Sequence, residues 1–465
     1  MLERLLGIQP VAGAISSYSD LPTSAWYYPW VQSSIQLNIA QGTSHHLFKP
    51  NRDVTREEAA VLMSRALKQT VKQSLVISST LPDALFQDQA KIAPWALDSV
   101  IRLRNFGLMK GDNGSFRPNE PISRQEAAVL IHRAWTYPGW SERIRATPSE
   151  KIQLGWQYGQ TTVQFEQQVA LSDVNTLSPR WFFLGKTSAV ENNADTSLVS
   201  WAHKRGKKVW AMVGNHSDQE TSHITLSSKD QRKEFIRQLI DLVKQYDIDG
   251  LNIDFENMSA QDRDSFTAFV TELHAQLKSI STTLSVNVSP DSGTDWTDVF
   301  DYSAIGQAAD YVVLMGYDEH WSGDPEVGSV SSLPWLRHGV ETLLKKVSPR
   351  KVILALPFYT QLWTTSATNT TSSAELDLAG QNNMILLKRL IPDWDENHGQ
   401  YYAQFNVPNA LNQIWLEDGR SLSLKVGLGE SYSLAGYGYW YLGGESADIW
   451  TSLRNAMRFA NYDFS

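Results

Sequence analysis

The sequence predicts a multidomain protein. An all-α N-terminal part precedes an α/β part, a (β/α)8 TIM barrel with an α+β insertion between its seventh and eighth strands. The chain has 465 residues, which is too long for one ordinary domain. Its first 140 residues repeat internally with a constant offset of 68 residues. From Lys151 onward, segments typical of strands and of helices alternate, as in a barrel of parallel strands.

The internal repeat is visible in three pairs of short segments. They are residues 18–20 (YSD) and 86–88 (FQD), 48–51 (FKPN) and 116–119 (FRPN), and 55–62 (TREEAAVL) and 123–130 (SRQEAAVL). Thr55 and Ser123 are natural helix N-caps, and Glu58 and Glu126 follow three residues later. This spacing predicts a capping box at the start of each of these helices. Each repeat is therefore expected to hold two helices joined by a glycine-containing loop.

The repeats and the strand pattern set the predicted domain boundaries. Gly139 and Pro148 mark a linker. Residues 1–7 (MLERLLG) are similar to residues 61–67 (VLMSRAL), which suggests the tail of another repeat. In chain order, the predicted parts are a remnant of a preceding repeat (1–15), a repeat (16–72), a second repeat (73–140), a linker (141–150) and the barrel (151–465).

Eight candidate strands predict the barrel. They are residues 151–158, 181–184, 208–214, 250–255, 284–289, 311–316, 351–357 and 436–441. Before the fourth strand, Phe235, Leu239 and Val243 recur at helical spacing, as expected for a helix that covers a barrel. The insertion is expected in the long gap between the seventh and eighth strands, at about residues 364–435.

Residues 249–256 (DGLNIDFE) carry the strongest functional signal. They alternate as strand residues do, so Asn252, Asp254 and Glu256 point to one face and the apolar residues to the other. Two carboxylates this close make it costly to ionise both, so one tends to keep a proton at neutral pH. A protonated carboxyl beside a carboxylate is what cleavage of a glycosidic bond requires.

The alternative for this segment is an edge strand with a solvated acidic face. Gly250, the apolar opposite face and the long amphipathic segment just upstream favour a buried parallel strand instead. Active sites in (β/α)8 barrels lie at the C-terminal ends of the strands. Asp254 and Glu256 end the fourth strand and are therefore expected at the mouth of the barrel.

The octapeptide resembles the DGxDxDxE signature of glycoside hydrolase family 18, the chitinase-like family. Asn252 stands where most members have Asp. The sixth strand ends in Met315, Tyr317 and Asp318, which is similar to the family's MxYD element. Trp440, at the end of the eighth strand, stands at the position of the family's tryptophan under the reacting sugar.

The resemblance implies substrate-assisted retaining hydrolysis of β-1,4 bonds next to N-acetylglucosamine, with no metal and no cofactor. The run EHWSG after Asp318, together with Asn252, resembles the bacterial branch that acts on peptidoglycan, which favours peptidoglycan over chitin-type oligomers. Glu256 would act as acid and base, Asp254 would orient the acetamido group, and Tyr317 would donate to its carbonyl. The implied supporting residues are Asp249, Asn252 and Asp318, and the implied substrate-binding residues are Trp440, Met315 and Tyr359.

Two other functions remain for the barrel. One is a non-catalytic glycan-binding or cell-surface protein that uses a chitinase-like barrel as a lectin. Loss of Glu256 would favour that function, and Glu256 is present. The other is a phosphate-binding metabolic barrel, but no Gly-rich phosphate loop follows the seventh and eighth strands.

The two repeats resemble S-layer homology repeats, including the T-R-x-E element at residues 55–58. Such repeats anchor exported proteins, so the resemblance implies binding to a secondary cell-wall polysaccharide and an extracellular location at the bacterial cell wall or S-layer. Arg56 and Arg124 would face the acidic sugar, because a guanidinium forks onto a carboxylate. Asp20 and Asp88 are further candidates for this site. The alternative is that both arginines pair with neighbouring acidic residues.

Composition excludes several classes of partner. A formal net charge of −9 and a pI of about 5.6 argue against nucleic acid. The sequence has no apolar run long enough to span a bilayer. With no cysteine, the chain forms neither disulfides nor cysteine metal sites. Residues 1–10 include Glu3 and Arg4 and show no secretory signal in this chain.

Overall fold

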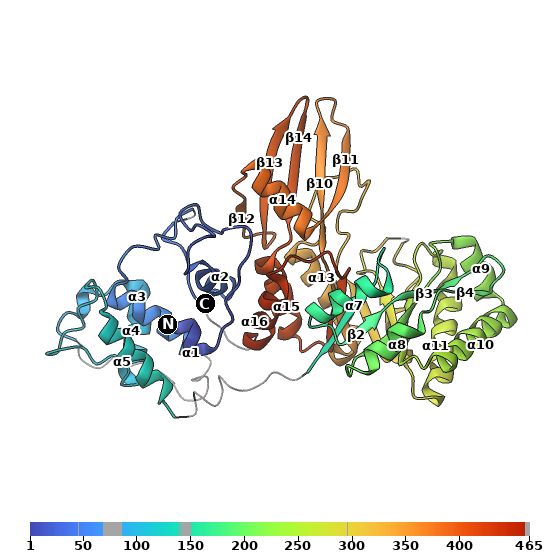
Figure 1. The fold of residues 1–465 in the computed structure, drawn as a ribbon, viewed down its shortest axis with the longest axis horizontal. Coiled ribbons are helices and arrows are strands. Elements are labelled where there is room, and N and C mark those ends of the chain that lie inside the picture. The colour runs from blue at the N-terminus through green and yellow to red at the C-terminus, as the bar shows by residue number, and fades with distance from the viewer. Residues whose placement is uncertain (45, 68–85, 139, 141–149, 295, 461–465) are drawn as a thin grey trace. The chain divides into compact units, whose positions relative to one another are not determined.

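The computed structural model describes residues 1–44, 46–67, 86–138, 140, 150–294 and 296–460. The chain divides into two compact units, one formed by Met1–Ser149 with Ala447–Ser465 and the other by Glu150–Ser446 (Figure 1). The predicted linker, apart from Glu150, and the predicted border between the repeats at residues 72 and 73 lie outside the described residues.

The N-terminal unit is helical, as predicted. Its described elements are α1 (Leu2–Leu6), α2 (Tyr28–Gln36), α3 (Arg56–Leu67), the 3-10 helix η2 (Gln89–Lys91), α4 (Pro94–Asn105), α5 (Arg124–Trp135) and α16 (Ile449–Phe459). Both predicted capping boxes are present. The Ser123 hydroxyl accepts from the Glu126 N–H at 3.2 Å, and the Glu126 carboxylate accepts from the Ser123 N–H at 2.9 Å. Thr55 and Glu58 make the same pair of bonds at 3.3 and 2.9 Å.

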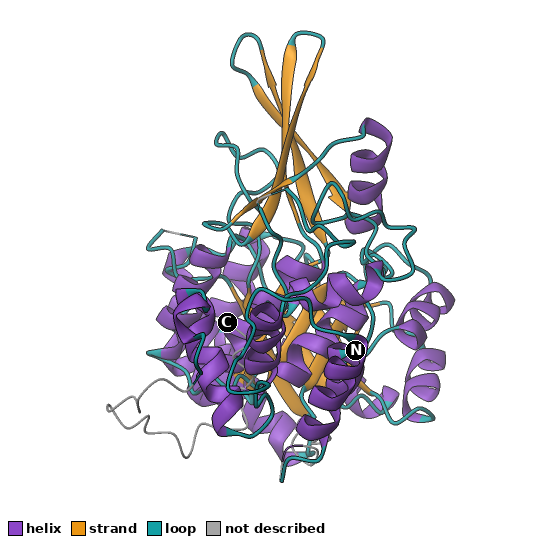
Figure 2. Ribbon diagram, turned by 90° about the vertical axis from the view of Figure 1, so that its left-hand side faces the viewer, coloured by secondary structure: helices purple, strands orange, loops and turns teal. Residues whose placement is uncertain are grey.

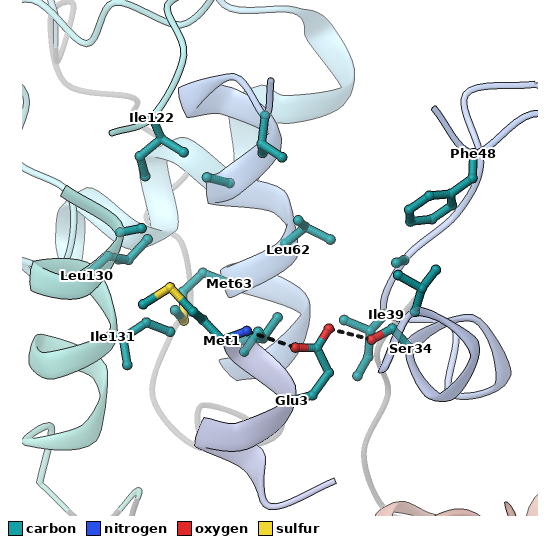
Figure 3. Close-up of a pocket in the computed structure, with 16 residues that line it drawn as sticks. Met1, Glu3, Ser34, Ile39, Phe48, Leu62, Met63, Ile122, Leu130 and Ile131 are labelled. Atoms are coloured by element: carbon teal, nitrogen blue, oxygen red, sulfur yellow. Dashed lines mark hydrogen bonds and ion pairs between the residues drawn. The ribbon is translucent and has the colours of Figure 1, made fainter. Parts of the chain in front are cut away.

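The apolar faces of these helices form one core, which includes Leu6 of α1, Met63 of α3, Val100 of α4 and Leu130 of α5. A pocket of about 320 Å³ remains beside α1, α3 and α5 (Figure 3). Its lining is apolar except for Glu3 and Ser34, whose hydroxyl donates to the Glu3 carboxylate at 2.8 Å (Figure 3).

The last helix differs from its predicted assignment. The strand pattern predicts that residues 151–465 form the barrel, whereas α16 belongs to the N-terminal unit. Asn455 of α16 accepts from the Gln9 N–H at 3.0 Å and donates to the Gln9 carbonyl at 2.8 Å, and Phe459 joins the helical core. An amphipathic helix pattern shows that an apolar face exists but not which core covers it. The sequence therefore could not assign α16.

The second unit is a closed barrel of parallel strands, as predicted. The strands are β1 (Ile152–Trp156), β2 (Thr176–Ser178) with β3 (Arg180–Leu184), β5 (Lys208–Gly214), β6 (Gly250–Asp254), β7 (Thr283–Val288), β8 (Tyr311–Met315), β9 (Val352–Pro357) and β15 (Gly436–Trp440). Pairing of β2 with both β1 and β5 closes the ring.

The second strand of the barrel is divided into two, which was not predicted. The sequence predicts one strand at residues 181–184, but β2 and β3 together occupy this position on either side of Pro179. Proline has no N–H for the ladder, and the register of β3 against β5 shifts between Arg180 and Phe182. The antiparallel β4 (Val190–Asn192) then pairs with β3.

Helices surround the barrel strands (Figure 2). They are α7 (Thr162–Leu171), α8 (Thr196–His203), α9 (Gln219–Ser227), α10 (Lys229–Tyr246), η3 (Ala260–Asp262), α11 (Arg263–Ser279), α12 (Tyr302–Ala308), α13 (Leu333–Leu344), η4 (Pro349–Lys351) and α15 (Gly419–Ser431). The predicted helix before the fourth strand is α10, which buries Phe235, Leu239 and Val243 and ends at the left-handed Asp247. Among the described residues, we find no helix with both the length and the hydrophobicity to cross a bilayer.

The predicted α+β insertion follows β9 and extends away from the barrel as a twisted sheet (Figure 1). It consists of β10 (Tyr359–Ser366), β11 (Thr371–Asp377), α14 (Leu378–Lys388), β12 (Asp393–Asp395), β13 (Gln400–Val407) and β14 (Ala410–Leu416). The five strands are antiparallel, in the order β11-β10-β14-β13-β12. Because β10 begins two residues after β9 ends, the insertion starts at the barrel mouth.

Candidate active site

The two predicted catalytic carboxyls lie at the C-terminal end of β6. Asp254 is the last residue of the strand and is 8% exposed, and Glu256 follows two residues later at the open mouth. Asp254 accepts a hydrogen bond from the Asn287 amide of β7 at 2.9 Å. The strand is buried along its whole length, so the alternative of a solvated edge strand is wrong.

The Asn252 side chain is fully satisfied inside the barrel, where it is 0% exposed. Its oxygen accepts from the Trp156 indole at 2.9 Å, and its nitrogen donates to Ser285 at 3.0 Å and to Asn287 at 2.7 Å. Asn287 in turn donates to Asp254. Asn252 is therefore linked to Asp254 through Asn287.

A buried asparagine of the neighbouring strand end holds Glu256 in place. The Asn215 amide donates to the Glu256 carbonyl at 2.8 Å and accepts from the Glu256 N–H at 3.0 Å, so it fixes both sides of that backbone. The Ser217 hydroxyl also donates to the Glu256 carboxylate, at 3.3 Å. These bonds fix the Glu256 backbone and hold its carboxylate beside Ser217.

The acidity of Glu256 suits a proton donor at neutral pH. Although the side chain reaches solvent, the walls of the mouth displace water from its carboxyl, and this loss of hydration is the largest cause that raises the pKa to about 7. Repulsion from Asp254 and, less strongly, from Asp318 adds to the rise, while Ser217 and Arg180 oppose it. Burial also raises the pKa of Asp254, against the opposing effects of Asn287 and Arg180.

Tyr317 and Asp318 come to the same mouth from the end of β8. Burial raises the pKa of Tyr317 well above its usual value, followed by repulsion from Asp254, Asp318 and Glu256, so the phenol remains a donor. Its hydroxyl makes no hydrogen bond within the described residues. Asp318 accepts from the Tyr359 hydroxyl at the start of β10. The predicted Tyr359 therefore supports Asp318 from the insertion, and its own contacts are to Asp318 and the Tyr317 ring.

The predicted substrate-binding residues Trp440 and Met315 end β15 and β8. Trp440 is half-buried among aromatic rings, with its centroid 5.4 Å from that of Tyr158 and 6.0 Å from that of Trp156. Met315 is half-buried at the end of its strand. The Trp440 ring thus forms part of the aromatic wall of the mouth.

Asp249 lies apart from this group. It precedes β6 and accepts from the Val209 N–H at 2.8 Å and pairs with His203 at 2.8 Å. Asp254 lies five positions further along the extended chain, or roughly 16 Å away. Asp249 therefore holds the N-terminal end of the strand through Val209 and His203. It was predicted as a supporting residue of the site, but it lies at the end of the strand opposite the mouth.

Four polar residues of the site were not predicted from the sequence, namely Arg180, Asn215, Ser217 and Asn287. For one of them a signal existed, because residues 284–289 (LSVNVS) alternate as residues 250–255 do and place Ser285 and Asn287 beside Asn252. Within the described ranges, no cluster of three or more His, Asp or Glu side chains could hold a metal ion.

Comparison with known proteins identifies this arrangement. Residues 157–445 match the family model of glycosyl hydrolases family 18. The chain belongs to this family. It is a chitinase-like glycosidase, and the alternatives of a non-catalytic lectin and of a phosphate-binding barrel are set aside. Residues 17–60 and 85–128 match the S-layer homology domain, which indicates attachment to the cell surface.

Similar proteins include two from Bacillus subtilis. The chain is 28% identical over 298 residues to the uncharacterized glycosylase YvbX of Bacillus subtilis, covering 61% of this chain and 85% of the relative. It is 25% identical over 285 residues to the cortical fragment-lytic enzyme of Bacillus subtilis, covering 58% of this chain and 64% of that enzyme.

Solved structures with a similar fold include a chitinase and a spore cortex-lytic enzyme. A chitinase from Chromobacterium violaceum has a TM-score of 0.61 at 21% identity, covering 66% of this chain and 99% of that one. The spore cortex-lytic enzyme SleL of Bacillus cereus has a TM-score of 0.61 at 18% identity, covering 67% and 75%. At these identities the likeness concerns the fold alone.

The predicted wall-binding arginines differ in their surroundings. Arg56 is 6% exposed, donates to the Phe116 carbonyl at 2.8 Å and pairs with Glu126 of the other repeat. Arg124 is exposed and forms no ion pair within the described residues. Arg56 thus pairs with an acidic residue, as the alternative prediction had it. Arg124 is exposed, so a ligand can reach it.

Asp20 and Asp88 have matching structural roles in the two repeats. Asp20 accepts from the N–H groups of Phe48 and Lys49, both at 2.8 Å. Asp88 accepts from the N–H groups of Phe116 and Arg117 at 2.7 and 2.8 Å. Each aspartate therefore fixes the loop that leads to the second helix of its repeat.

The substitution Asn252→Asp tests the buried amide. An ionised carboxylate at this position cannot donate to Asn287, so Asn287 would turn toward it and weaken its bond to Asp254. We expect kcat/KM to fall by roughly tenfold or less. The alkaline limb of the pH–rate profile should move to higher pH, because a further negative charge nearby makes Glu256 hold its proton more tightly. Ser285→Ala is the matched control, since it removes one acceptor of the Asn252 amide and a donor to the Leu251 carbonyl without adding a charge. A profile that superimposes on the parent's would show that Asn252 only fills space.

Proposed function

We propose that this chain is a cell-wall-anchored hydrolase that cleaves β-1,4 bonds next to N-acetylglucosamine, with peptidoglycan as the favoured substrate. The observation that carries this proposal is the Glu256 carboxyl, whose pKa of about 7 keeps much of it protonated at neutral pH beside Asp254 and the unbonded Tyr317 hydroxyl. A general acid works best when its pKa lies near the working pH.

The proposed reaction is substrate-assisted. Glu256 gives its proton to the glycosidic oxygen while the oxygen of the 2-acetamido group attacks the anomeric carbon, so the leaving sugar departs and a cyclic oxazolinium ion forms. Asp254, held by Asn287, accepts the acetamido N–H and stabilises the positive charge. Tyr317 donates to the acetamido oxygen. Glu256 then removes a proton from water, which opens the ring with retention of configuration.

Two observations support peptidoglycan over chitin. One relative is a cortical fragment-lytic enzyme, and the S-layer homology domains indicate that the barrel is held at the cell surface, where peptidoglycan is at hand. No cofactor enters the proposed reaction, because the nucleophile is part of the substrate.

Product analysis tests the proposed function. We expect purified peptidoglycan to give fragments with N-acetylglucosamine at the cleaved bond, identified by mass spectrometry. Glycans whose 2-acetamido groups have been deacetylated should be resistant, since the nucleophile is gone. Equal cleavage of the deacetylated glycan would exclude substrate assistance, and cleavage of chitin oligomers without any action on peptidoglycan would exclude the favoured substrate.

Anchoring by the repeats is a separate proposal, tested with the full chain and purified Gram-positive cell walls. Arg124→Ala should weaken sedimentation with walls on the order of tenfold, as for loss of a charged hydrogen bond. Arg56→Ala should instead lower thermal stability, because it removes the ion pair with Glu126 and the side-chain donor to the Phe116 carbonyl. Arg102→Ala, which removes an exposed pair with Asp98, is the control. Unchanged binding to walls stripped of their acidic polysaccharide would contradict the anchoring proposal.

A further inference from the structure

Arg180 lies near the barrel mouth and carries a positive charge, but the proposed reaction gives it no role. It is the first residue of β3 and stands opposite Met212 of β5, which in turn stands opposite Asn252 of β6. The split at Pro179 and the register shift that follows bring this arginine into the layer of the catalytic strand. Its positive charge acts on both Asp254 and Glu256.

Aromatic rings fix the position of this guanidinium. Its central carbon lies 5.1 Å from the ring centre of Tyr158, 5.5 Å from that of Phe183 and 6.0 Å from that of Trp440. A cation at these distances from ring faces is attracted to them. Because the Trp440 and Tyr158 rings also contact each other, the three side chains form one contiguous group beside the C-terminal end of β15.

The donors of Arg180 are unused. Its side chain forms no hydrogen bond and no ion pair within the described residues, and its Nε is buried without a partner. A guanidinium carries five N–H donors in a fixed plane. The Arg180 side chain is half-buried, and its buried Nε has lost water without gaining an acceptor, which costs hydration energy. A carboxylate that accepts from the guanidinium would offset this cost.

An alternative role for Arg180 is to neutralise the charge of the catalytic acids, but this role does not account for its unbonded donors. No carboxylate oxygen of Asp254, Glu256 or Asp318 lies within ion-pair distance of Arg180. The pKa of Glu256 is still raised to about 7 despite the nearby cation. The guanidinium therefore lowers the pKa values of Asp254 and Glu256 only through its charge, and it donates no hydrogen bond to any of the three acids.

We propose that Arg180 binds a carboxylate on the sugar next to the cleaved bond, so that the site selects acidic N-acetylglucosamine glycans over neutral ones. The inference rests on the proposed function and narrows its substrate class. In peptidoglycan, the 3-O-lactyl group of muramic acid supplies a carboxylate of this kind where no peptide is attached, and the stem peptide supplies others. A neutral chitin-type chain has none.

The test compares three forms of one alternating glycan in the full-length enzyme. The first has free lactyl carboxylates and no peptides, the second has the same groups converted to neutral amides, and the third keeps its stem peptides. We expect the parent to show a kcat/KM on the order of 10- to 100-fold higher for the free carboxylate than for the amide. A preference confined to the peptide-bearing form would place the recognised carboxylate on the peptide and overturn the lactyl assignment.

Variants of Arg180 make the assignment specific. Arg180→Gln should reduce the preference for the acidic form to less than about threefold, and Arg180→Lys should keep part of it, since lysine retains the charge without the fork. Arg205→Gln is the control, because that guanidinium stacks on the Trp201 ring at the N-terminal side of β5. If Arg180→Gln lowered kcat/KM equally for both forms, Arg180 would be a structural residue and the inference would be wrong.

Binding separates failure of this inference from failure of the proposed function. The Glu256→Gln variant is titrated with the acidic and the amidated glycan, with and without Arg180→Gln. Equal binding of both forms by Glu256→Gln would overturn the role of Arg180 while leaving hydrolysis intact. Selective binding of the acidic form, in a parent enzyme that cleaves neither, would overturn the proposed function and leave the recognition by Arg180 standing.

Discussion

Glu256→Gln is expected to lower hydrolysis on the order of 10²–10⁴-fold while the protein stays folded and still binds glycan. Glutamine has nearly the same shape, and its amide cannot give a proton to the leaving oxygen. The backbone bonds between Asn215 and residue 256 are unaffected by the change, so the loop should keep its position.

Steady-state rates, thermal unfolding and glycan binding should be measured on the same preparation. Ser217→Ala is the matched control, since it removes one weak hydrogen bond at 3.3 Å to the same carboxylate and leaves the proton donor in place. Turnover close to the parent's in Glu256→Gln would remove this residue from its role as acid.

Asp254→Asn should lower kcat on the order of 10²–10³-fold, with a smaller effect on substrate binding. The carboxylate acts on the charged intermediate, and a neutral amide gives up that stabilisation. It also removes the repulsion that raises the pKa of Glu256. The remaining activity should therefore be lost at a lower pH than in the parent, in which it falls as pH rises through about 7 and Glu256 gives up its proton.

The pH dependence of kcat/KM checks this prediction. Asp249→Asn is the control from the other end of the same strand, where it should reduce stability through the lost contacts to Val209 and His203 without moving the alkaline limb. An alkaline limb that stays in place in Asp254→Asn would mean that the two carboxyls do not interact as proposed.

Local patterns in the sequence were enough for much of the fold. Seven of the eight barrel strands lie where alternation and strand-forming residues predict them, the second was predicted only in its β3 part, and both capping boxes form at the predicted residues. These features depend on residues a few positions apart, so short segments carry the whole signal. For the same reason, the side-chain alternation in residues 249–256 placed Asn252, Asp254 and Glu256 on one side.

The surroundings of those residues depend on contacts between distant parts of the chain. Asn252 meets Trp156 across 96 positions, and Asn287 reaches Asp254 across 33, so neither bond leaves a trace in a local pattern. The same limit explains why Asp249 was predicted to support the site. The sequence shows an aspartate next to the strand, but local alternation does not show which end of the strand lies at the mouth.

The sequence by itself determined the family, the general order of strands and helices, and the identity of the central carboxyls. Each of these depends on motifs whose residues are close together in the chain. Only the tertiary structure decided that α16 joins the helical unit, that Arg56 is buried against Glu126, and that Arg180 stands in the mouth with unused donors. The physical reason is that strand register and ring closure are set by many weak contacts acting together, and these choose which distant side chains meet.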